Sequence, residues 1–198
     1  MELVTHNIAW SSRRDHKPMV IAPIGDIQWS GKRGSTAGDI LKRHIDKCMK
    51  LEAWFVGLGD FTDFMSPSNR QRFKAAALYE SAEDVVDDAA LELFHELYED
   101  YLKPTKGRWL GLVHGHHWAQ LRTGDTTDMR LCQMLGAKFL GTCAYIRVVF
   151  HNGTSKFTMT LFVHHGCGGG LKMSAPLNKI ENLLPYWDAD VFLLGHTT

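Results

Sequence analysis

The sequence has no net charge and no long apolar run. Lys plus Arg and Asp plus Glu number 22 each, so no global field favours nucleic acid or an anionic membrane surface, although a local basic groove stays open. No stretch reaches the roughly 18 apolar residues that a membrane-spanning helix needs, and no secretory leader begins the chain. We therefore expect a cytoplasmic protein that has no membrane partner.

Cysteine pairs and a serine nucleophile motif are also absent. The four cysteines form no CxxC pair, which predicts free thiols in a reducing compartment, and no Gly-x-Ser-x-Gly elbow is present; the cysteines are Cys48, Cys132, Cys143 and Cys167. Cys167 lies in the glycine-rich turn 166–170. This turn is either a phosphate cradle or a flexible loop.

What the chain does contain is an alternation of apolar runs and amphipathic stretches. With 198 residues, this predicts one α/β domain. Strands are expected at 18–24, 54–58, 108–113 and 190–194, with a hairpin of 144–150 and 156–163 turned at His151-Asn152-Gly153. Helices are expected from Asp39 as N-cap, over 81–102 with Ser81 and Asp84 at capping-box spacing, and over 127–135.

Five of the predicted strands end in a glycine next to Asp or His. Since ligands of open α/β sheets bind beyond the carboxyl ends of the strands, these five ends can meet at one site. Asp and His are ligands of Mn, Fe or Zn, and glycine lets the chain turn sharply there. A single such pair is an ordinary turn, but five in succession indicate a metal site. The pairs are Gly25-Asp26, Gly59-Asp60, Gly115-His116, His165-Gly166 and Gly195-His196.

In their order, these motifs resemble those of the calcineurin-like metallophosphoesterase superfamily, and the likeness spans Gly25 to the end of the chain. A narrower likeness to phage and bacterial members covers 117–141. The resemblance implies a four-layer α-β-β-α sandwich with two mixed β-sheets and a metal site at the carboxyl ends of strands. It implies one metallophosphoesterase domain over residues 1–198 that lacks the family's C-terminal strands. The motifs are Asp26-Ile27-Gln28, Gly59-Asp60-Phe61-Thr62-Asp63, Gly115-His116-His117, His164-His165-Gly166 and Gly195-His196-Thr197.

The resemblance also implies a role for each site residue. Asp26 and Gln28 would bind the first of two divalent ions, and Asp60 would bridge both. The second ion would be held by His116, His165 and His196, with His164 as the competing choice for His165. His117 would be the catalytic acid near the leaving group, and Asp63 would support the site without binding a metal.

The motifs depart from the family pattern at four positions. Gln28 and Thr198 stand where histidines are expected, which weakens the first metal site and favours a hard ion. His116 replaces an Asn and should strengthen the second site, and Trp118 replaces an acidic residue. Mn is the expected metal, with Fe, Zn or Mg as alternatives.

The function expected from this resemblance is a two-metal phosphodiesterase or nuclease that uses a metal-bridging hydroxide. Its substrate would be a phosphoester, with nucleic acid or a nucleotide as candidates. Alternatives are a phosphomonoesterase of the phosphatase or nucleotidase type, disfavoured by the lack of an Arg pair beside the third motif, and a non-catalytic scaffold. Trp29 and Trp118 follow two of the motifs and either stack on a base or pack against the cleft. Three basic side chains near the motifs either contact a phosphodiester backbone or are solvated loop charges; they are Lys32, Arg33 and Arg122.

Overall fold

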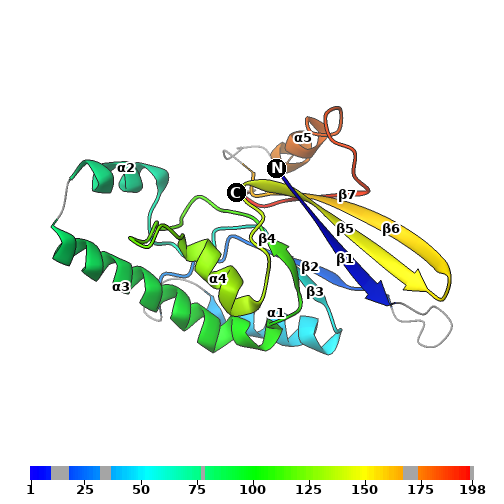
Figure 1. Ribbon diagram of the computed structural model, residues 1–198, viewed down its shortest axis with the longest axis horizontal. Coiled ribbons are helices and arrows are strands. Elements are labelled where there is room, and N and C mark those ends of the chain that lie inside the picture. The colour runs from blue at the N-terminus through cyan, green and yellow to red at the C-terminus, as the bar shows by residue number, and fades with distance from the viewer. Residues whose placement is uncertain (10–17, 32–36, 77–78, 167–173, 197–198) are drawn as a thin grey trace.

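The computed structural model describes residues 1–9, 18–31, 37–76, 79–166 and 174–196 of the chain, which form two β-sheets with helices (Figure 1). The strands are β1 (Glu2–Ala9), β2 (Ile21–Ile24), β3 (Trp54–Gly57), β4 (Trp109–Leu112), β5 (Cys143–Asn152), β6 (Ser155–His164) and β7 (Val191–Leu194). The helices are α1 (Gly38–Lys50), α2 (Pro67–Ala75), α3 (Glu80–Leu97), α4 (Thr127–Leu135) and α5 (Ala175–Glu181).

The smaller sheet, β2-β3-β4, is parallel throughout. We had expected two mixed sheets, so that expectation is wrong for this one. The physical reason is that α1 connects β2 to β3, and α2 and α3 lie between β3 and β4. A helical crossover returns the chain to the starting end of the sheet, which makes successive strands parallel. The carboxyl ends of all three strands therefore lie on the same edge.

The larger sheet, β1-β5-β6-β7, is mixed as expected. β5 and β6 are an antiparallel hairpin, while β1 runs parallel to β5 and β7 parallel to β6. The hairpin pairs Asn152 with Ser155, so His151 and Asn152 belong to the strand and the turn is shorter than predicted. Gly153 takes the required left-handed conformation, with φ of 61°.

Two cores hold the layers together. One lies between the parallel sheet and the helices α1, α3 and α4, and the other lies between the two sheets (Figure 1). Phe55 of β3 faces the helices and Val56 faces the other sheet, and both are fully buried. On the outer face of the larger sheet, the Trp187 ring stacks on Phe162 at 5.2 Å between centroids. The architecture is therefore α/β with two sheets, but a complete fourth helical layer is not confirmed.

Several helix boundaries differ from those expected. The residue capping α1 is Ala37 rather than Asp39, and α3 begins at Glu80, so Ser81 lies inside the helix and makes no capping box. The α-helix of α3 ends at Leu97 and continues to Leu102 as a π-helical segment. α4 has the predicted bounds, because Thr126 caps its first turn through a hydrogen bond from the Met129 amide.

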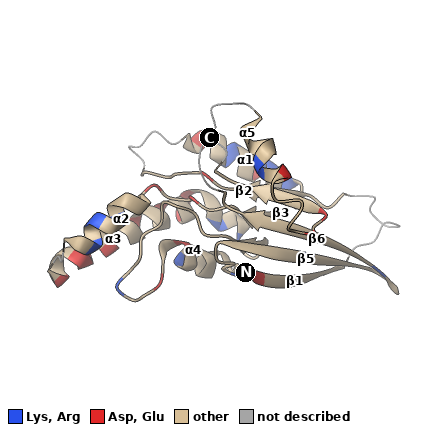
Figure 2. Cartoon of the chain, turned by 90° about the horizontal axis from the view of Figure 1, so that it is seen from above, with Lys and Arg blue, Asp and Glu red and all other residues tan. Residues whose placement is uncertain are grey.

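Charge is distributed unevenly although the total is zero. Acidic residues are concentrated on α3, whereas α2 carries Arg70, Arg72 and Lys74 and no acidic residue (Figure 2). Within the described part of the chain, no helix is long and apolar enough to cross a membrane. Cys48, Cys132 and Cys143 are free thiols, as predicted, and Cys167 lies outside the described residues.

Candidate metal centre

The loops that follow β2, β3, β4, β6 and β7 contact one another. The Asp26 amide donates to the Gly59 carbonyl at 3.0 Å, and the Gly195 amide donates to the His164 carbonyl at 3.2 Å. Gly59 has φ of +87°, and a Cβ there would lie 2.6 Å from the Gly115 nitrogen. A side chain at this position would collide with backbone, so glycine is what allows the second and third loops to touch.

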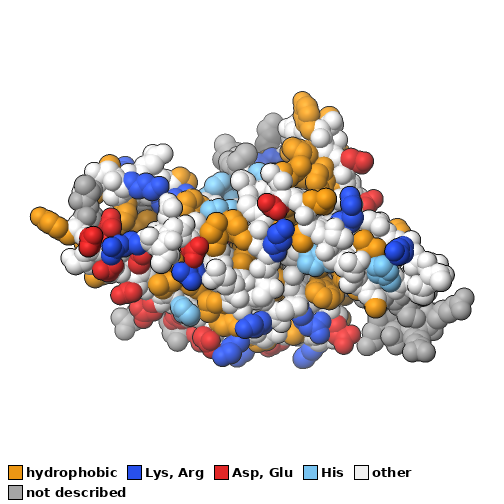
Figure 3. Space-filling model, in the orientation of Figure 1, with side chains coloured by type: hydrophobic (Ala, Val, Ile, Leu, Met, Phe, Trp, Pro, Cys, Tyr) orange, Lys and Arg blue, Asp and Glu red, His pale blue; other side chains and the backbone are white. Residues whose placement is uncertain are grey.

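One group of side chains among the described residues could hold a metal ion. It consists of Asp60, His116, His165 and His196, and one ligand atom from each lies within 4.8 Å of all the others. Asp60 and His165 are buried, while His116 and His196 are partly exposed. All four are residues that the sequence motifs predicted for the second metal and the bridge. Histidine side chains reach the surface in the recess between α2 and α5 (Figure 3).

At the centre of this cluster lie two buried atoms that have no hydrogen-bond partner in the described part of the chain. Asp60 Oδ2 and His165 Nε2 are 3.1 Å apart, yet they do not meet hydrogen-bond geometry. Ligand atoms bound to one transition metal are separated by about 3.0–3.4 Å when each lies roughly 2.1 Å from the ion. A metal ion therefore fits these two atoms, and burying both without one would be costly.

The other nitrogen of His165 supports the same conclusion. Its Nδ1 lies 2.5 Å from the Leu58 carbonyl, which requires the proton on Nδ1 and leaves Nε2 free to bind. Metal-binding histidines usually fix their tautomer in this way. Burial lowers the pKa of His165, but the Asp60 carboxylate and the Leu58 carbonyl outweigh it and raise the pKa above 6.5.

The surroundings of Asp60 keep its carboxylate ionised, as binding a metal ion would require. Its second oxygen, Oδ1, accepts hydrogen bonds from the amides of His116 and His117, the latter at 2.9 Å. Burial raises the pKa of Asp60, but the neighbouring His165 ring and these amides prevail and hold it at about 2. The two backbone amides thus take up Oδ1 of Asp60, while Oδ2 faces the histidines of the cluster.

Left-handed backbone conformations are concentrated at the site. Five described residues other than glycine have positive φ, and four of them are Asp26 (51°), Gln28 (49°), Asp60 (51°) and His196 (47°). This conformation is unfavourable for residues with a Cβ and clusters at functional sites, where the surroundings enforce it. Glu52, at the turn after α1, is the fifth.

The residues predicted for the first metal lie beside the four-residue cluster but are not members of it. Asp26 Oδ2 accepts a hydrogen bond from the His196 amide at 2.8 Å, and the Gln28 amide donates to the Asp60 carbonyl at 2.9 Å. Thr198 lies outside the described residues, as do Lys32, Arg33 and the glycine-rich turn from Cys167. The structure therefore brings the second-site residues together more closely than those of the first.

His117 and His164 are both placed outside the cluster. His117 Nδ1 lies 2.7 Å from Asp63 Oδ1, a pair that the motifs had not predicted, and the partly exposed ring can present Nε2 to a substrate. His164 Nδ1 instead accepts a hydrogen bond from the Gly166 amide at 2.7 Å. Of the two competing histidines, His165 is the one that joins Asp60.

Two polar residues behind the site were missed in the sequence. Arg70 of α2 donates to the His116 carbonyl at 2.6 Å, and Asp128 of α4 accepts from the Gly115 amide at 3.2 Å. Asp128 is almost completely buried, and burial raises its pKa to about 7. No motif marks either residue. The only signal for Asp128 was its place in the first turn of a predicted helix.

The two tryptophans that we considered as stacking platforms pack within the protein. Trp29 is 2% exposed and its Nε1 donates to Glu96 at 3.1 Å. The guanidinium carbon of Arg70 lies 4.0 Å from the centroid of the Trp118 ring. The centroids of the Trp118 and His114 rings are 4.5 Å apart. The packed alternative is therefore favoured for both. His114 is packed as well, since its ring also contacts Phe139 and burial lowers its pKa to about 4.

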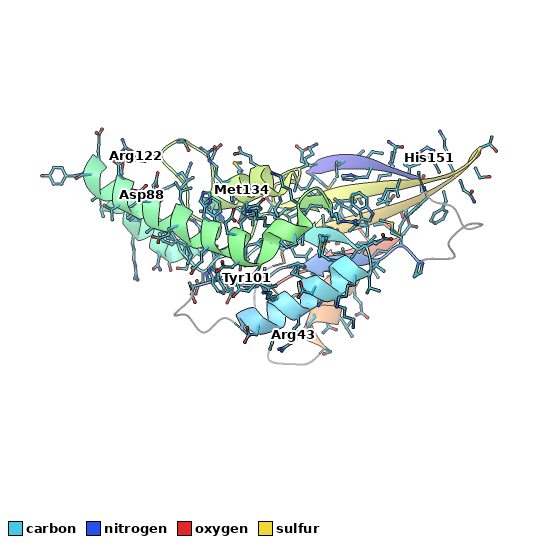
Figure 4. All side chains as sticks on the ribbon, turned by 90° about the horizontal axis from the view of Figure 1, so that it is seen from below. Arg43, Asp88, Tyr101, Arg122, Met134 and His151 are labelled. Atoms are coloured by element: carbon cyan, nitrogen blue, oxygen red, sulfur yellow. The ribbon has the colours of Figure 1, made fainter. Side chains whose placement is uncertain are left out.

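Arg122 is directed away from the site. Its guanidinium pairs with Asp84, Glu83 and Glu80 of α3, and Figure 4 shows it at the far end of that helix. His151 lies at the opposite end of the molecule, near the hairpin tip (Figure 4). Neither residue is placed to contact a phosphate at the cluster.

Comparison with protein-family models, curated proteins and solved structures found no match.

Proposed function

We propose that this chain is a metal-dependent phosphoester hydrolase that acts on phosphodiesters, as a phosphodiesterase or nuclease. The observation that carries the proposal is that two buried atoms, Asp60 Oδ2 and His165 Nε2, face each other without a hydrogen-bond partner among the described residues. They lie inside a cluster of three histidines and one carboxylate. A donor set of this kind suits a divalent transition metal. Beside it, but outside it, lies a histidine with its own carboxylate, the arrangement of a general acid.

The residues divide into two ligand sets. Asp60, His116, His165 and His196 would hold one ion, and Asp26 and Gln28 would join Asp60 around the other. When bound, two divalent ions, Mn first with Fe, Zn or Mg as alternatives, would offset phosphate charge and lower the pKa of a water. The set with three histidines should bind its ion more tightly than the set with Asp26 and Gln28, because it contains three nitrogen donors.

The protein groups supply orientation and a proton. Asp63 keeps the proton of neutral His117 on Nδ1, so protonation places the transferable proton on Nε2. His117 can then protonate the leaving oxygen of the ester. Asp60, whose pKa the His165 ring and two backbone amides hold at about 2, is ionised at neutral pH.

The choice of diesters rests on the arginines. A monoester carries more negative charge and is usually bound by free guanidinium groups. Arg122 is paired with three acidic residues of α3, and Arg70 has its Nη1 directed to backbone carbonyls. Neither is a free clamp, which disfavours the phosphomonoesterase alternative. A non-catalytic scaffold stays the third candidate, because Asp26 and Gln28 are not part of the four-residue cluster.

Metal analysis combined with two substrates tests the three possibilities. Purified protein would be dialysed, loaded with Mn²⁺ and assayed with one chromogenic diester and one chromogenic monoester. Bound metal with faster diester hydrolysis supports the proposal, and faster monoester hydrolysis supports the alternative. Bound metal without hydrolysis of either would identify a scaffold. No metal at all would contradict the site itself.

A further inference from the structure

A single peptide group in the site is held at both ends by charged side chains. The carbonyl of His116 and the amide of His117 belong to the same peptide unit. Arg70 Nη1 donates to the carbonyl at 2.6 Å, while the amide donates to Asp60 Oδ1 at 2.9 Å. This peptide plane therefore lies between a guanidinium and a carboxylate, and rotating it would break both bonds.

Arg70 is itself fixed by neighbours on the same loops. Its Nη1 also lies 2.8 Å from the Met65 carbonyl and 2.9 Å from the Trp118 carbonyl. The nitrogen carries two hydrogens for three acceptors, so at least one hydrogen is shared. The guanidinium carbon lies 4.0 Å from the centroid of the Trp118 ring, which holds the plane of the group. Hydrogen bonds from a charged donor are about twice as strong as neutral ones.

The helix that provides Arg70 has little other attachment. None of the described residues of α2 is buried, and its sequence lacks an apolar face. In Figure 1, α2 projects beside α3 at one end of the molecule. The hydrogen bonds of Arg70 therefore link this helix to the loop that carries His116 and His117.

We propose that Arg70 is a positioning residue for the hydrolysis proposed above, on which this inference rests. It acts through the His116–His117 peptide. By fixing that plane, Arg70 keeps the His116 ring in the metal cluster and the His117 ring against Asp63. It touches neither the metal nor the substrate. Displacing catalytic groups by about 1 Å can lower a rate by roughly 100-fold, so this constraint should be measurable in turnover.

The test compares three variants of the full chain under saturating Mn²⁺. Arg70→Ala should lower kcat by about 10- to 100-fold with KM changed by less than about threefold. Millimolar guanidinium should restore part of the lost kcat in Arg70→Ala but not in His117→Ala. Arg70→Lys, which keeps the charge without the planar fork, should be intermediate and should not respond to guanidinium. Arg72→Ala, an exposed change on the same helix, is the matched control and should keep wild-type kcat.

Backbone exchange gives a measurement that needs no substrate. The His117 amide should exchange hydrogen at least about tenfold faster in Arg70→Ala than in wild type, since one side of its peptide is released. If wild type hydrolyses no ester, the proposed function fails while this exchange still decides the role of Arg70. Unchanged kcat and exchange in Arg70→Ala, or lost kcat that guanidinium leaves unchanged, would overturn the inference. If Arg70→Ala does not fold, wild-type kcat and exchange in Arg70→Lys would overturn it.

Discussion

His165 Nε2 and Asp60 Oδ2 face each other at 3.1 Å in the interior of the protein, and neither has a hydrogen-bond partner among the described residues. Buried polar atoms are normally paired, and an exception calls for an explanation such as an ion. Four buried atoms of this kind are found among the described residues, and these two coincide at the meeting point of five loops. The predictions below test whether a metal ion is that explanation.

Replacing Asp60 by Asn should weaken both proposed metal sites at once. The change keeps the side-chain shape but removes the charge that offsets repulsion between two cations. We expect the variant to fold, to lose most bound metal, and to lose hydrolysis that added Mn²⁺ restores only in part. Metal content by elemental analysis and diester turnover measure this. Full metal content with normal activity would refute the two-metal model.

The two proposed metal sites should differ in affinity. Three histidines serve one site, whereas the other has Asp26, the neutral amide of Gln28 and no described histidine of its own. Titration of the metal-free protein with Mn²⁺ or Zn²⁺ in a calorimeter should show one tight and one weak event. Two equally tight events would show that the substitutions in the motifs have no effect on binding.

The adjacent histidines His164 and His165 provide a matched pair. His165→Ala should remove most of the tightly bound metal, because its Nε2 lies against Asp60. His164→Ala should retain it, since that ring is bonded to the Gly166 amide instead. Metal content after extensive dialysis distinguishes them. The reverse result would assign the ligand role to His164.

His117 should affect chemistry without affecting metal binding. His117→Ala should keep metal near the wild-type level and lower turnover by roughly 10²–10⁴-fold, the usual contribution of an acid–base group. Asp63→Asn should have a smaller effect in the same direction, since it removes only the charge that orients the ring. If His117→Ala lost its metal, the roles of His116 and His117 would have to be exchanged.

Asp128 should make the stability of the fold fall as pH rises. Burial raises its pKa to about 7 in the folded state, above the ordinary value of 3.8. When the pKa of a carboxyl is higher in the folded than in the unfolded state, its contribution to stability is complete at pH values below the unfolded pKa. This contribution is lost as pH rises from about 4 through 7. Asp128→Asn, which cannot ionise, should therefore lose less stability between pH 5 and pH 8. Urea unfolding of the metal-free proteins at both pH values measures the difference, and equal losses would contradict the burial effect.

Local sequence patterns predicted the elements with strong apolar or capping signals. α4 begins after its Thr126 cap and ends at Gly136. The β5–β6 hairpin turns at Gly153, within the predicted turn, although Asn152 belongs to β5. β1 was missed because five of its eight residues are exposed and polar residues interrupt the apolar ones, so it lacks the apolar run of a buried strand. α2 was missed for a similar reason, since it has no buried residue.

For the site, the motifs predicted the residues that end strands but not those that hold them. Asp60 and His165 could be found because glycine adjoins them in the sequence. Arg70 reaches His116 across 46 sequence positions, and no local pattern encodes such a contact. Asp128 likewise acts on Gly115 through the packing of α4, which depends on the tertiary fold.

The dispersal of the site along the chain has a consequence for biosynthesis. Asp26 and His196 are joined by a hydrogen bond although they are 170 positions apart in sequence. A nascent chain can complete α1 and the parallel sheet while the last ligand is still inside the ribosome. If the cluster binds an ion, His196 can join its ligands only after β7 has paired with β6. The metal content of a preparation would then report the fraction of molecules in which both sheets have assembled, which helical content measured by circular dichroism does not.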